Sequence, residues 1–425
     1  MRRAILLVLI GGWWLLPVAR YPSIAPGTGF PWWVTGIALP SDMLLTKAWV
    51  PPLAAFAGAA IRDWRTLAGW RPGLIDVPML GWCLWPLVNG LGAAANPPGW
   101  VSSLYLIGAW GLPWVIGRVW LSGDDGRLAL LKALALSGLA SIPLAIVEGL
   151  RGPLFYRLIY GPHPFQLDGI DRYVGYRPLG FFENGNLYGL WAALAAFAAL
   201  WLARVKFRGS SSWLGVAILN LLVLLASQSV GSIVLVGVGI ALLLLWRSPI
   251  FLPLVAASGA LMIAVMAVHL SGIVPLQSIA HSPAGEKAIG AMRSIGRGSF
   301  LWRVSQDSKT LATVAAHPVA GTAQWDWWRP YGTRPWGQLL LLVGQFGLVG
   351  LALAWGSLLG ACAATVGRLR RSTKDPIQHP SAPLAVIVLL TLFDALLNAF
   401  FFAPALLAAG AIAASVATSR DGAAT

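Results

Sequence analysis

Long apolar runs, separated by short polar segments, cover most of this 425-residue chain. A helix that crosses a membrane needs roughly 17–25 mostly apolar residues, and about twelve runs meet that requirement. They lie near 4–19, 42–60, 74–92, 101–119, 128–148, 186–204, 213–228, 231–246, 250–269, 337–366, 382–398 and 402–418. Only 11% of the residues are charged, whereas a soluble domain carries about 25%. The sequence therefore predicts an all-α, polytopic membrane protein in which residues 1–425 form a single membrane domain.

The basic residues predict how these helices alternate across the membrane. Cytoplasmic loops carry an excess of Lys and Arg, and Arg2 and Arg3 directly precede the first run, so we expect a cytoplasmic N-terminus. Alternation from there places six arginine-containing segments inside: 62–71, 118–127, 204–208, Arg247, 368–374 and the tail at Arg420. The expected outer segments 93–100 and 228–232 carry no charge. Both termini are therefore predicted to be cytoplasmic.

The formal net charge of +15 has to be explained within this layout. Because no soluble basic domain is evident, we predict no nucleic-acid partner. Cytoplasmic loops and a site for an anionic lipid or diphosphate account for the charge better. Cys83 and Cys362 both lie in apolar runs, which argues against a disulfide framework or a CxxC metal site. Since zinc-ligand spacing, a P-loop and a GxSxG elbow are also absent from the sequence, we expect neither a metal nor a cofactor.

Two long polar segments, 149–185 and 271–335, fall on the outer side and hold most of the charge there. Within the second segment, residues 299–316 have a helical pattern. Its apolar face is formed by Phe300, Val304, Leu311, Val314 and Ala315, and its polar face by Arg303, Asp307 and Thr310. We therefore expect an amphipathic helix that lies on the membrane surface or over a cavity.

The first outer loop ends in the sequence RPLGFFENGN, which concentrates polar side chains directly before an apolar run. Arg177, Glu183, Asn184 and Asn186 combine a guanidinium, a carboxylate and two amides with glycines that permit sharp turns. Aromatic and basic side chains at this position are also typical of anchoring at the membrane interface. The two interpretations are evenly matched for Arg172, whereas the sequence around Arg177 favours a site for a polar substrate.

The second outer loop contains further candidates. Arg303 could pair with Asp307 at i, i+4, or it could bind phosphate oxygens, which planar Arg does better than Lys. His317 fits an ordinary histidine at a helix end or a catalytic group. Asp326 lies among tryptophans that are typical of the membrane interface or of a sugar-binding surface. The remaining substrate-binding candidates are Arg293, Arg297, Trp325, Arg329, Arg334, Trp336 and Gln338.

Four charged residues fall inside the predicted spans, where a charge is costly: Lys47, Asp76, Lys132 and Asp394. Asp76 and Lys132 lie near the ends of their spans, so we expect both to reach the membrane surface. Asp394 is the best candidate for an intramembrane functional group. A hydrogen bond from Asn398, one helical turn later, would make it structural instead.

Three motifs resemble the bacterial O-antigen ligase and O-antigen polymerase superfamily of membrane glycosyltransferases. Arg177 with GFFENGN is similar to that family's Arg-x-x-Gly-x-Phe-x-(Asn/Asp)-x-Asn segment. Arg303, fourteen residues before His317-Pro-Val-Ala-Gly, is similar to the arginine that precedes the family's His-Pro-(Leu/Val)-x-Gly. GQFGLVGLAL, from Gly344, resembles the family's Glu-x-Gly-Leu-(Leu/Ile)-Gly helix. The order, spacing and common outer face of the three motifs make the resemblance fairly specific over about 172–360.

One position departs from the ligase pattern. The ligases have a histidine eleven residues before the first glycine of the Gly-x-x-Gly, and counting back from Gly347 reaches Trp336 in this chain. The resemblance is therefore closer to the polymerase branch, whose loop sequences vary more.

The resemblance implies a GT-C-like fold in the bacterial inner membrane, with a metal-independent transferase site on the periplasmic face. The donor would be a polyprenyl-diphosphate-linked oligosaccharide. In an exopolysaccharide or O-antigen polymerase, the acceptor would be a sugar hydroxyl of another lipid-linked repeat unit; in a ligase, it would be lipid A–core or a protein. Arg177 and Arg303 would stabilise the leaving diphosphate, and Glu183, His317 and Asp326 are the candidates for a general base.

Further partners implied by the resemblance are membrane lipid and a chain-length regulator or an export complex. A transporter or flippase of an anionic lipid-linked substrate is an alternative from a different class of protein. It fits the arginines of the outer loops, but the spans contain few charges and no paired broken helices in two related halves are evident.

Overall fold

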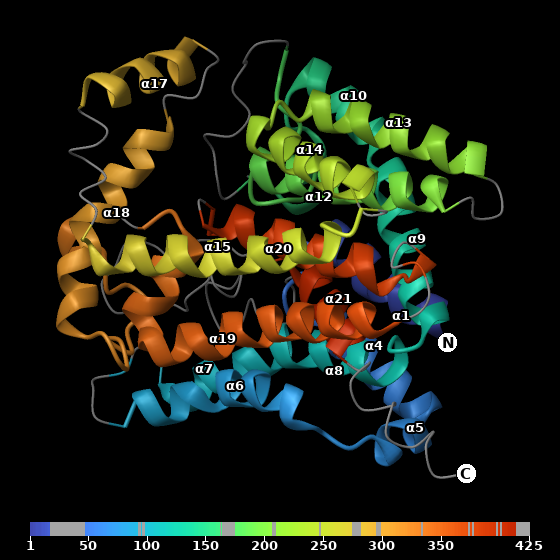
Figure 1. The fold of residues 1–425 in the computed structure, drawn as a ribbon, viewed down its shortest axis with the longest axis horizontal. Coiled ribbons are helices and arrows are strands. Elements are labelled where there is room, and N and C mark those ends of the chain that lie inside the picture. The colour runs from blue at the N-terminus through green and yellow to red at the C-terminus, as the bar shows by residue number, and fades with distance from the viewer. Residues whose placement is uncertain are drawn as a thin grey trace.

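A computed structural model describes most of the chain outside the residue 18–46 region and the C-terminal tail. The described ranges are 1–17, 47–91, 95, 98–161, 163, 175–205, 210–245, 248–273, 282–294, 299–332, 335–372, 375, 378–396, 398–399 and 402–413. Within these ranges the chain is almost entirely helical and contains no β-strand (Figure 1). The all-α prediction is therefore confirmed for this part of the chain.

Each predicted apolar run contains at least one helix. Four helical segments are long and apolar enough to cross a membrane: Gly99–Trp120, Asp124–Arg151, α12 (Gly185–Arg204) and α19 (Gln338–Arg371). The first comprises α7 (Gly99–Leu106), a π-helical turn and α8 (Leu112–Trp120), and the second comprises α9 (Asp124–Ala140) and α10 (Ile142–Arg151). The shorter apolar helices are α4 (Val50–Arg62), α6 (Val77–Asn89), α13 (Ser210–Ala226), α14 (Val230–Leu245), α15 (Phe251–Ser271), α20 (Ser381–Ala395) and α21 (Ala403–Ala413). The helices have the character of a membrane protein, while the number of spans remains a prediction.

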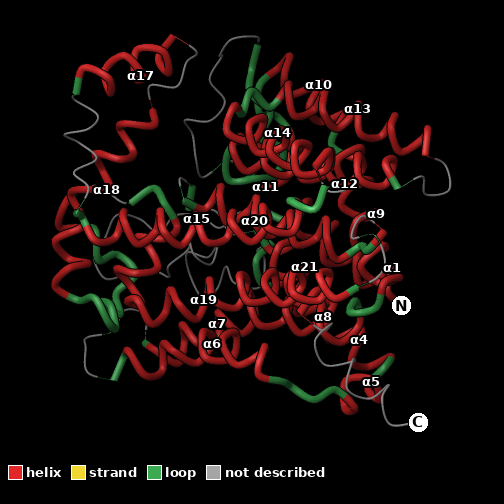
Figure 2. The backbone as a smooth tube through the Cα atoms, viewed as in Figure 1, coloured by secondary structure: helices red, strands yellow, loops and turns green. Residues whose placement is uncertain are grey.

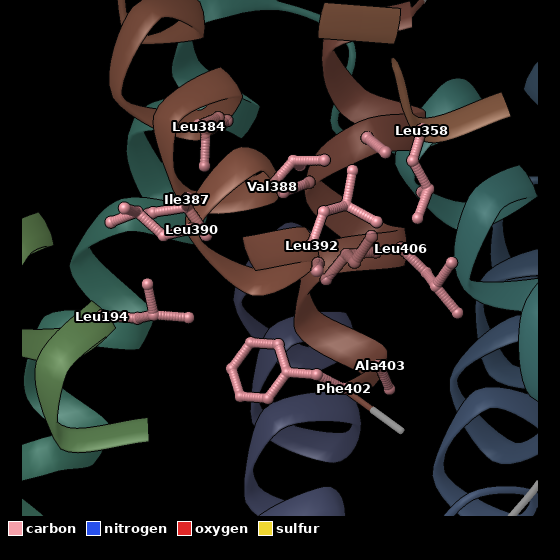
Figure 3. Close-up of a cluster of buried hydrophobic side chains, with 14 of the residues drawn as sticks. Leu194, Leu358, Leu384, Ile387, Val388, Leu390, Leu392, Phe402, Ala403 and Leu406 are labelled. Atoms are coloured by element: carbon pink, nitrogen blue, oxygen red, sulfur yellow. The ribbon is translucent and has the colours of Figure 1, made fainter. Parts of the chain in front are cut away.

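The helix α12 lies at the centre of the bundle. It packs against α9, α13, α14 and α20, and nearly all of its side chains are buried. Its many alanines allow the neighbouring helices to approach closely, which is how helices associate when lipid surrounds them. Figure 3 shows Leu194 of α12 beside the leucine- and isoleucine-rich face of α20. In the other half of the molecule, α15, α19, α20 and α21 run roughly alongside one another (Figure 2).

Opposite ends of the bundle carry different segments. The helices of the second polar segment, α17 (Pro283–Ser294) and α18 (Ser299–Ala316), lie at one end. The N-terminal helix α1 (Arg2–Leu6) and the basic helix α5 (Trp64–Gly69) lie at the other (Figure 1).

Two of the charged residues in the predicted spans have internal partners. Arg118 donates Nε to Oδ1 of Asp76 at 2.7 Å and Nη2 to Oδ2 at 2.9 Å, and Trp114 donates to Oδ1 as well. All three side chains are buried, so the expectation that Asp76 reaches the membrane surface is wrong: the carboxylate is neutralised inside the bundle. Asn398 donates Nδ2 to Oδ1 of Asp394 at 2.9 Å, which supports a structural role for Asp394.

Candidate functional site

A buried glutamate holds the backbone of the segment 175–184, at the end of the first outer loop, through hydrogen bonds. Glu148, in the last turns of α10, accepts hydrogen bonds from the backbone N–H groups of Leu179 at 2.9 Å and Gly180 at 2.7 Å. A third, longer bond comes from the N–H of Phe155. The carboxylate is completely buried and oriented by these donors. The sequence analysis missed this residue, although a glutamate at the end of an apolar run was a visible signal.

Arg177 is the central cation of this segment, and its side chain is buried. Its Nε donates to the carbonyl oxygen of Ser227 at 2.9 Å, and its Nη2 donates to Oδ1 of Asn186 at 2.7 Å. The guanidinium lies against Gly185, where any Cβ would overlap it. Contacts from the start of α12, from the turn that follows α13 and from Gly185 therefore fix the orientation of the charge.

The two asparagines have distinct roles at the start of α12. Asn184 is the N-cap residue, and its Oδ1 accepts hydrogen bonds from the N–H groups of Asn186 and Leu187. Asn186 instead uses its side-chain oxygen to hold Arg177. The positive end of a long, buried helix dipole thus lies next to a buried guanidinium, and both favour an anion at this place.

A serine-rich turn closes the other side of the arginine. Gln228 has a left-handed backbone, with φ of 51°, between the ends of α13 and α14. Ser229 and Ser232 are buried and their hydroxyls lie 2.9 Å apart. Gly189 of α12 allows this turn to pack directly against the helix. The turn accounts for the position of the Ser227 carbonyl.

Glu183 lies next to the buried Lys47, which the sequence analysis assigned to a predicted span but not to this site. Lys47 precedes α4, is 2% exposed, and donates Nζ to the carbonyl oxygen of Phe181. The Glu183 side chain is half-buried, and its Oε2 is closed off from solvent and accepts no hydrogen bond from the residues that the structure describes. Burial raises the pKa of the Glu183 carboxyl, and the positive charge of Lys47 partly offsets this effect.

In the second polar segment, α18 occupies residues 299–316 as predicted. Asp307 and Thr310 of its predicted polar face are buried, as is Val314 of its apolar face, whereas Ala315 of the apolar face is exposed. Asp307 accepts a hydrogen bond from the backbone N–H of Trp336 at 2.8 Å, and Thr310 donates to the carbonyl of Asp307. The buried carboxylate of Asp307 is satisfied there by the backbone of Trp336.

The tryptophan-rich turn after α18 forms a compact ionic group. Asp326 is buried and pairs with Arg329, whose Nε lies 2.9 Å from Oδ2. The guanidinium of Arg329 also lies over the rings of Trp325 and Trp328, at 5.6 and 5.9 Å from their centroids. The Asp326 carboxylate is therefore paired with the Arg329 guanidinium and not with a group that would give up a proton to a base.

The His317-Pro-Val-Ala-Gly turn and the glycine-rich helix form one joint. Gly347 interrupts α19 with φ of 72° and ψ of −177°, and the segment 318–323 packs into the break. Thr322 and Ala323 donate to the carbonyls of Gly344 and Gln345 at 2.9 Å. Beyond the break, the N–H of Leu348 donates to Pro318 and that of Val349 to Val319. Backbone groups of the turn therefore replace the missing helical bonds of α19.

The joint leaves His317 itself on the surface. It is exposed at the end of α18, and its carbonyl accepts the N–H of Gly321. Trp336 is half-buried before α19, and Gln338, the first residue of α19, is buried. For Arg293 and Arg303 the structure describes only the helical backbone, in α17 and α18. Arg172, Arg297 and Arg334 lie outside the described residues.

Arg177 and Asn186 are joined by a hydrogen bond at the start of α12, Asn184 caps that helix, and Glu183 lies beside Lys47. Asp326, Trp325 and Arg329 are grouped by contacts with one another. Among the described residues, no three His, Cys, Asp or Glu side chains come together as a metal site would require. Comparison with models of known protein families and with characterised proteins gave no match.

Proposed function

We propose that the protein is a polysaccharide polymerase, which transfers a glycan from polyprenyl diphosphate to a sugar hydroxyl of another lipid-linked repeat unit. The observation that carries this proposal is the buried guanidinium of Arg177, fixed by Ser227 and Asn186 at the N-terminus of α12. A preorganised positive charge in a site of low dielectric is what a leaving diphosphate requires. The motif resemblance supports the same reaction.

The chemistry follows from where negative charge develops. The acceptor oxygen forms a bond to the anomeric carbon as the bond from that carbon to the diphosphate oxygen breaks through an oxocarbenium-like transition state. The electron pair of the broken bond stays on the diphosphate, where Arg177 and the helix dipole stabilise it. Residue 303 of α18 is proposed to supply a second guanidinium to the same group.

The acceptor hydroxyl has to lose its proton in this step, and we assign Glu183 as the general base. Its Oε2 accepts no hydrogen bond from the described residues, and burial raises its pKa toward the working pH, which suits a base. Asp326 is paired with Arg329, and His317 is exposed at a helix end. Glu183 therefore takes the proton and becomes a carboxylic acid as the glycosidic bond forms.

The proposed site faces the periplasm of a bacterial inner membrane, with both chain termini in the cytoplasm. The alternation of basic segments supports this orientation. The grouping of α17 and α18 at one end of the bundle and of α1 and α5 at the other is consistent with it (Figure 1). A chain-length regulator or an export complex would then reach the growing polymer on the periplasmic side.

The test uses Arg177→Ala and Arg177→Lys in a strain that depends on this protein for polymer. Arg177→Ala should reduce long-chain polymer about 100- to 1,000-fold while the protein remains in the membrane. Arg177→Lys should recover little, because an ammonium cannot make both fixed hydrogen bonds. Arg303→Ala is expected to act similarly. Normal chain lengths in the alanine variants would overturn the assignment.

Purified protein distinguishes the proposal from its two alternatives. A polymerase elongates a lipid-linked glycan when no other acceptor is present. A ligase would require lipid A–core or a protein as acceptor and would leave the lipid-linked glycan unextended. A transporter or flippase would move the lipid-linked substrate across liposomes without forming a bond.

A further inference from the structure

Lys47 is a buried cation whose surroundings are unusual for a lysine. Its Nζ lies 4.6 Å from the ring centroid of Phe182 and 5.4 Å from that of Trp13, and it donates to the Phe181 carbonyl. Trp13 in turn stacks on Trp191 of α12 at 5.2 Å. A long flexible ammonium side chain is therefore fixed between aromatic faces inside the bundle.

We propose that Lys47 is a positioning residue, which holds the backbone of residues 181–183 and keeps the Glu183 carboxylate charged for the reaction. This inference rests on the proposed function, because it concerns the residue assigned there as the base. Lys47 contacts the peptide carbonyl two residues before Glu183 and the ring one residue before it.

A comparison of the two glutamates in this region explains why a cation is needed. The charge of Glu148 is stabilised by three backbone N–H groups. Glu183 Oε2 accepts no hydrogen bond within the described part of the chain, although it is closed off from solvent. A buried carboxylate oxygen without a donor is costly unless an opposite charge lies nearby. Lys47 supplies that charge, and the Coulomb interaction between the two residues lowers the pKa of Glu183 against the effect of burial.

Lys47 does not form a close ion pair with the Glu183 carboxylate. No ion pair within 4.0 Å joins Lys47 and Glu183 among the described residues, and Lys47 directs its Nζ to Phe181 instead. The cation thus acts at a distance and does not occupy the oxygen that would accept the proton. Other titratable groups around this segment are Glu148, His163, Arg177 and Tyr188.

The first experiment measures the pH dependence of glycan transfer by the purified protein. Lys47→Met removes the charge and keeps most of the apolar stem, whereas Lys47→Arg keeps the charge. The transfer rate falls at low pH, where Glu183 is protonated. Lys47→Met should therefore move the acid limb of the pH–rate profile to higher pH, by about one pH unit. Lys47→Arg should leave it in place. An unchanged acid limb in Lys47→Met would overturn the proposal.

A second experiment does not depend on catalysis. A hydrophobic carbodiimide reacts with protonated carboxyl groups, and peptide mass spectrometry measures its attachment to Glu183, with Glu183→Gln as the blank. At neutral pH, Lys47→Met should increase labelling at least several-fold over the wild type and over Lys47→Arg. Equal labelling would overturn the proposal. If the wild type transfers no glycan yet the labelling shift is present, the proposed function fails and the link between Lys47 and Glu183 stands.

A third measurement covers the case in which Lys47→Met folds poorly. That variant leaves a buried carboxylate without its counter-charge, so the double variant Lys47→Met/Glu183→Gln should recover most of the lost thermal stability. Losses that simply add would show that the two residues are not coupled.

Discussion

The segment around Arg177 and the segment around His317 each precede a long apolar helix, α12 and α19, and both carry polar motifs, but they are built differently. At the first, side-chain charges are buried around the start of α12: Arg177, Glu148 and Lys47 are inside, and Glu183 is partly so. At the second, the backbone of 318–323 completes the broken helix α19, and the ionic side chains Asp326 and Arg329 satisfy each other.

Under the proposed function, this difference distinguishes the region that would perform the reaction from the region that maintains the shape. Burying charges costs free energy that packing alone does not recover, so such a group is kept for function or for strong pairing. A joint made of paired backbone groups stabilises one geometry and needs no charge. The proposed reacting groups therefore belong to the first segment, and the second would have a structural role, apart from residue 303.

The strongest challenge to this distinction is a comparison of Glu183→Gln with His317→Gln. Removing the general base should lower the transfer rate about 100- to 10,000-fold, whereas the exposed His317 should tolerate the change with most of the activity retained. Rates are measured with purified protein and lipid-linked glycan. The reverse ranking would move the base to the second segment.

Gly347→Ala tests the structural role of the joint. A Cβ at this position would overlap the carbonyl of Val319, and φ of 72° disfavours any side chain. We expect a loss of about 2–4 kcal/mol in the free energy of unfolding, seen as a lower thermal midpoint and reduced membrane yield. Gly356→Ala is the matched control in the same helix, since no atom lies within 4 Å of its added methyl group. A stable Gly347→Ala variant would show that the break is not required.

Gly185→Ala sharpens the role of Arg177, because it moves the guanidinium without changing any charge. The added methyl group would overlap Nε, Cδ and Cζ of Arg177. A displaced catalytic group typically costs about 100-fold in rate, and we expect a loss of about 10- to 100-fold with the protein folded. Gly215→Ala, whose methyl group meets nothing within 4 Å, is the control. Equal activity in both variants would mean that the orientation of Arg177 is unimportant.

Asp326→Asn should have the smallest effect. The Arg329 side chain is 25% exposed, and a partly solvated ion pair contributes about 0–1 kcal/mol. The thermal midpoint should therefore shift by only a degree or two. A large decrease would indicate that this ion pair stabilises the joint in α19.

The sequence was sufficient to predict the helices, because apolar runs of the required length are local. It also located Arg177, Asn184 and Asn186, which lie within ten residues of one another. It could not reveal that Lys47 lies beside Glu183, or that Asp76 pairs with Arg118, because those contacts join residues distant in the chain. The burial of Asp307 could not be predicted for the same reason, since its partner is the backbone of Trp336.

The broken helix α19 also constrains the order in which the molecule assembles. In lipid, each unpaired backbone group costs several kcal/mol, so the break is stable only when the segment 318–323 is already docked. Asn89 of α6 donates to the carbonyls of Ala320 and Gln345, and Trp85 donates to that of Phe346. These contacts come from a helix synthesised about 250 residues earlier. The interruption therefore forms late in biogenesis, after the N-terminal helices have inserted and can receive it.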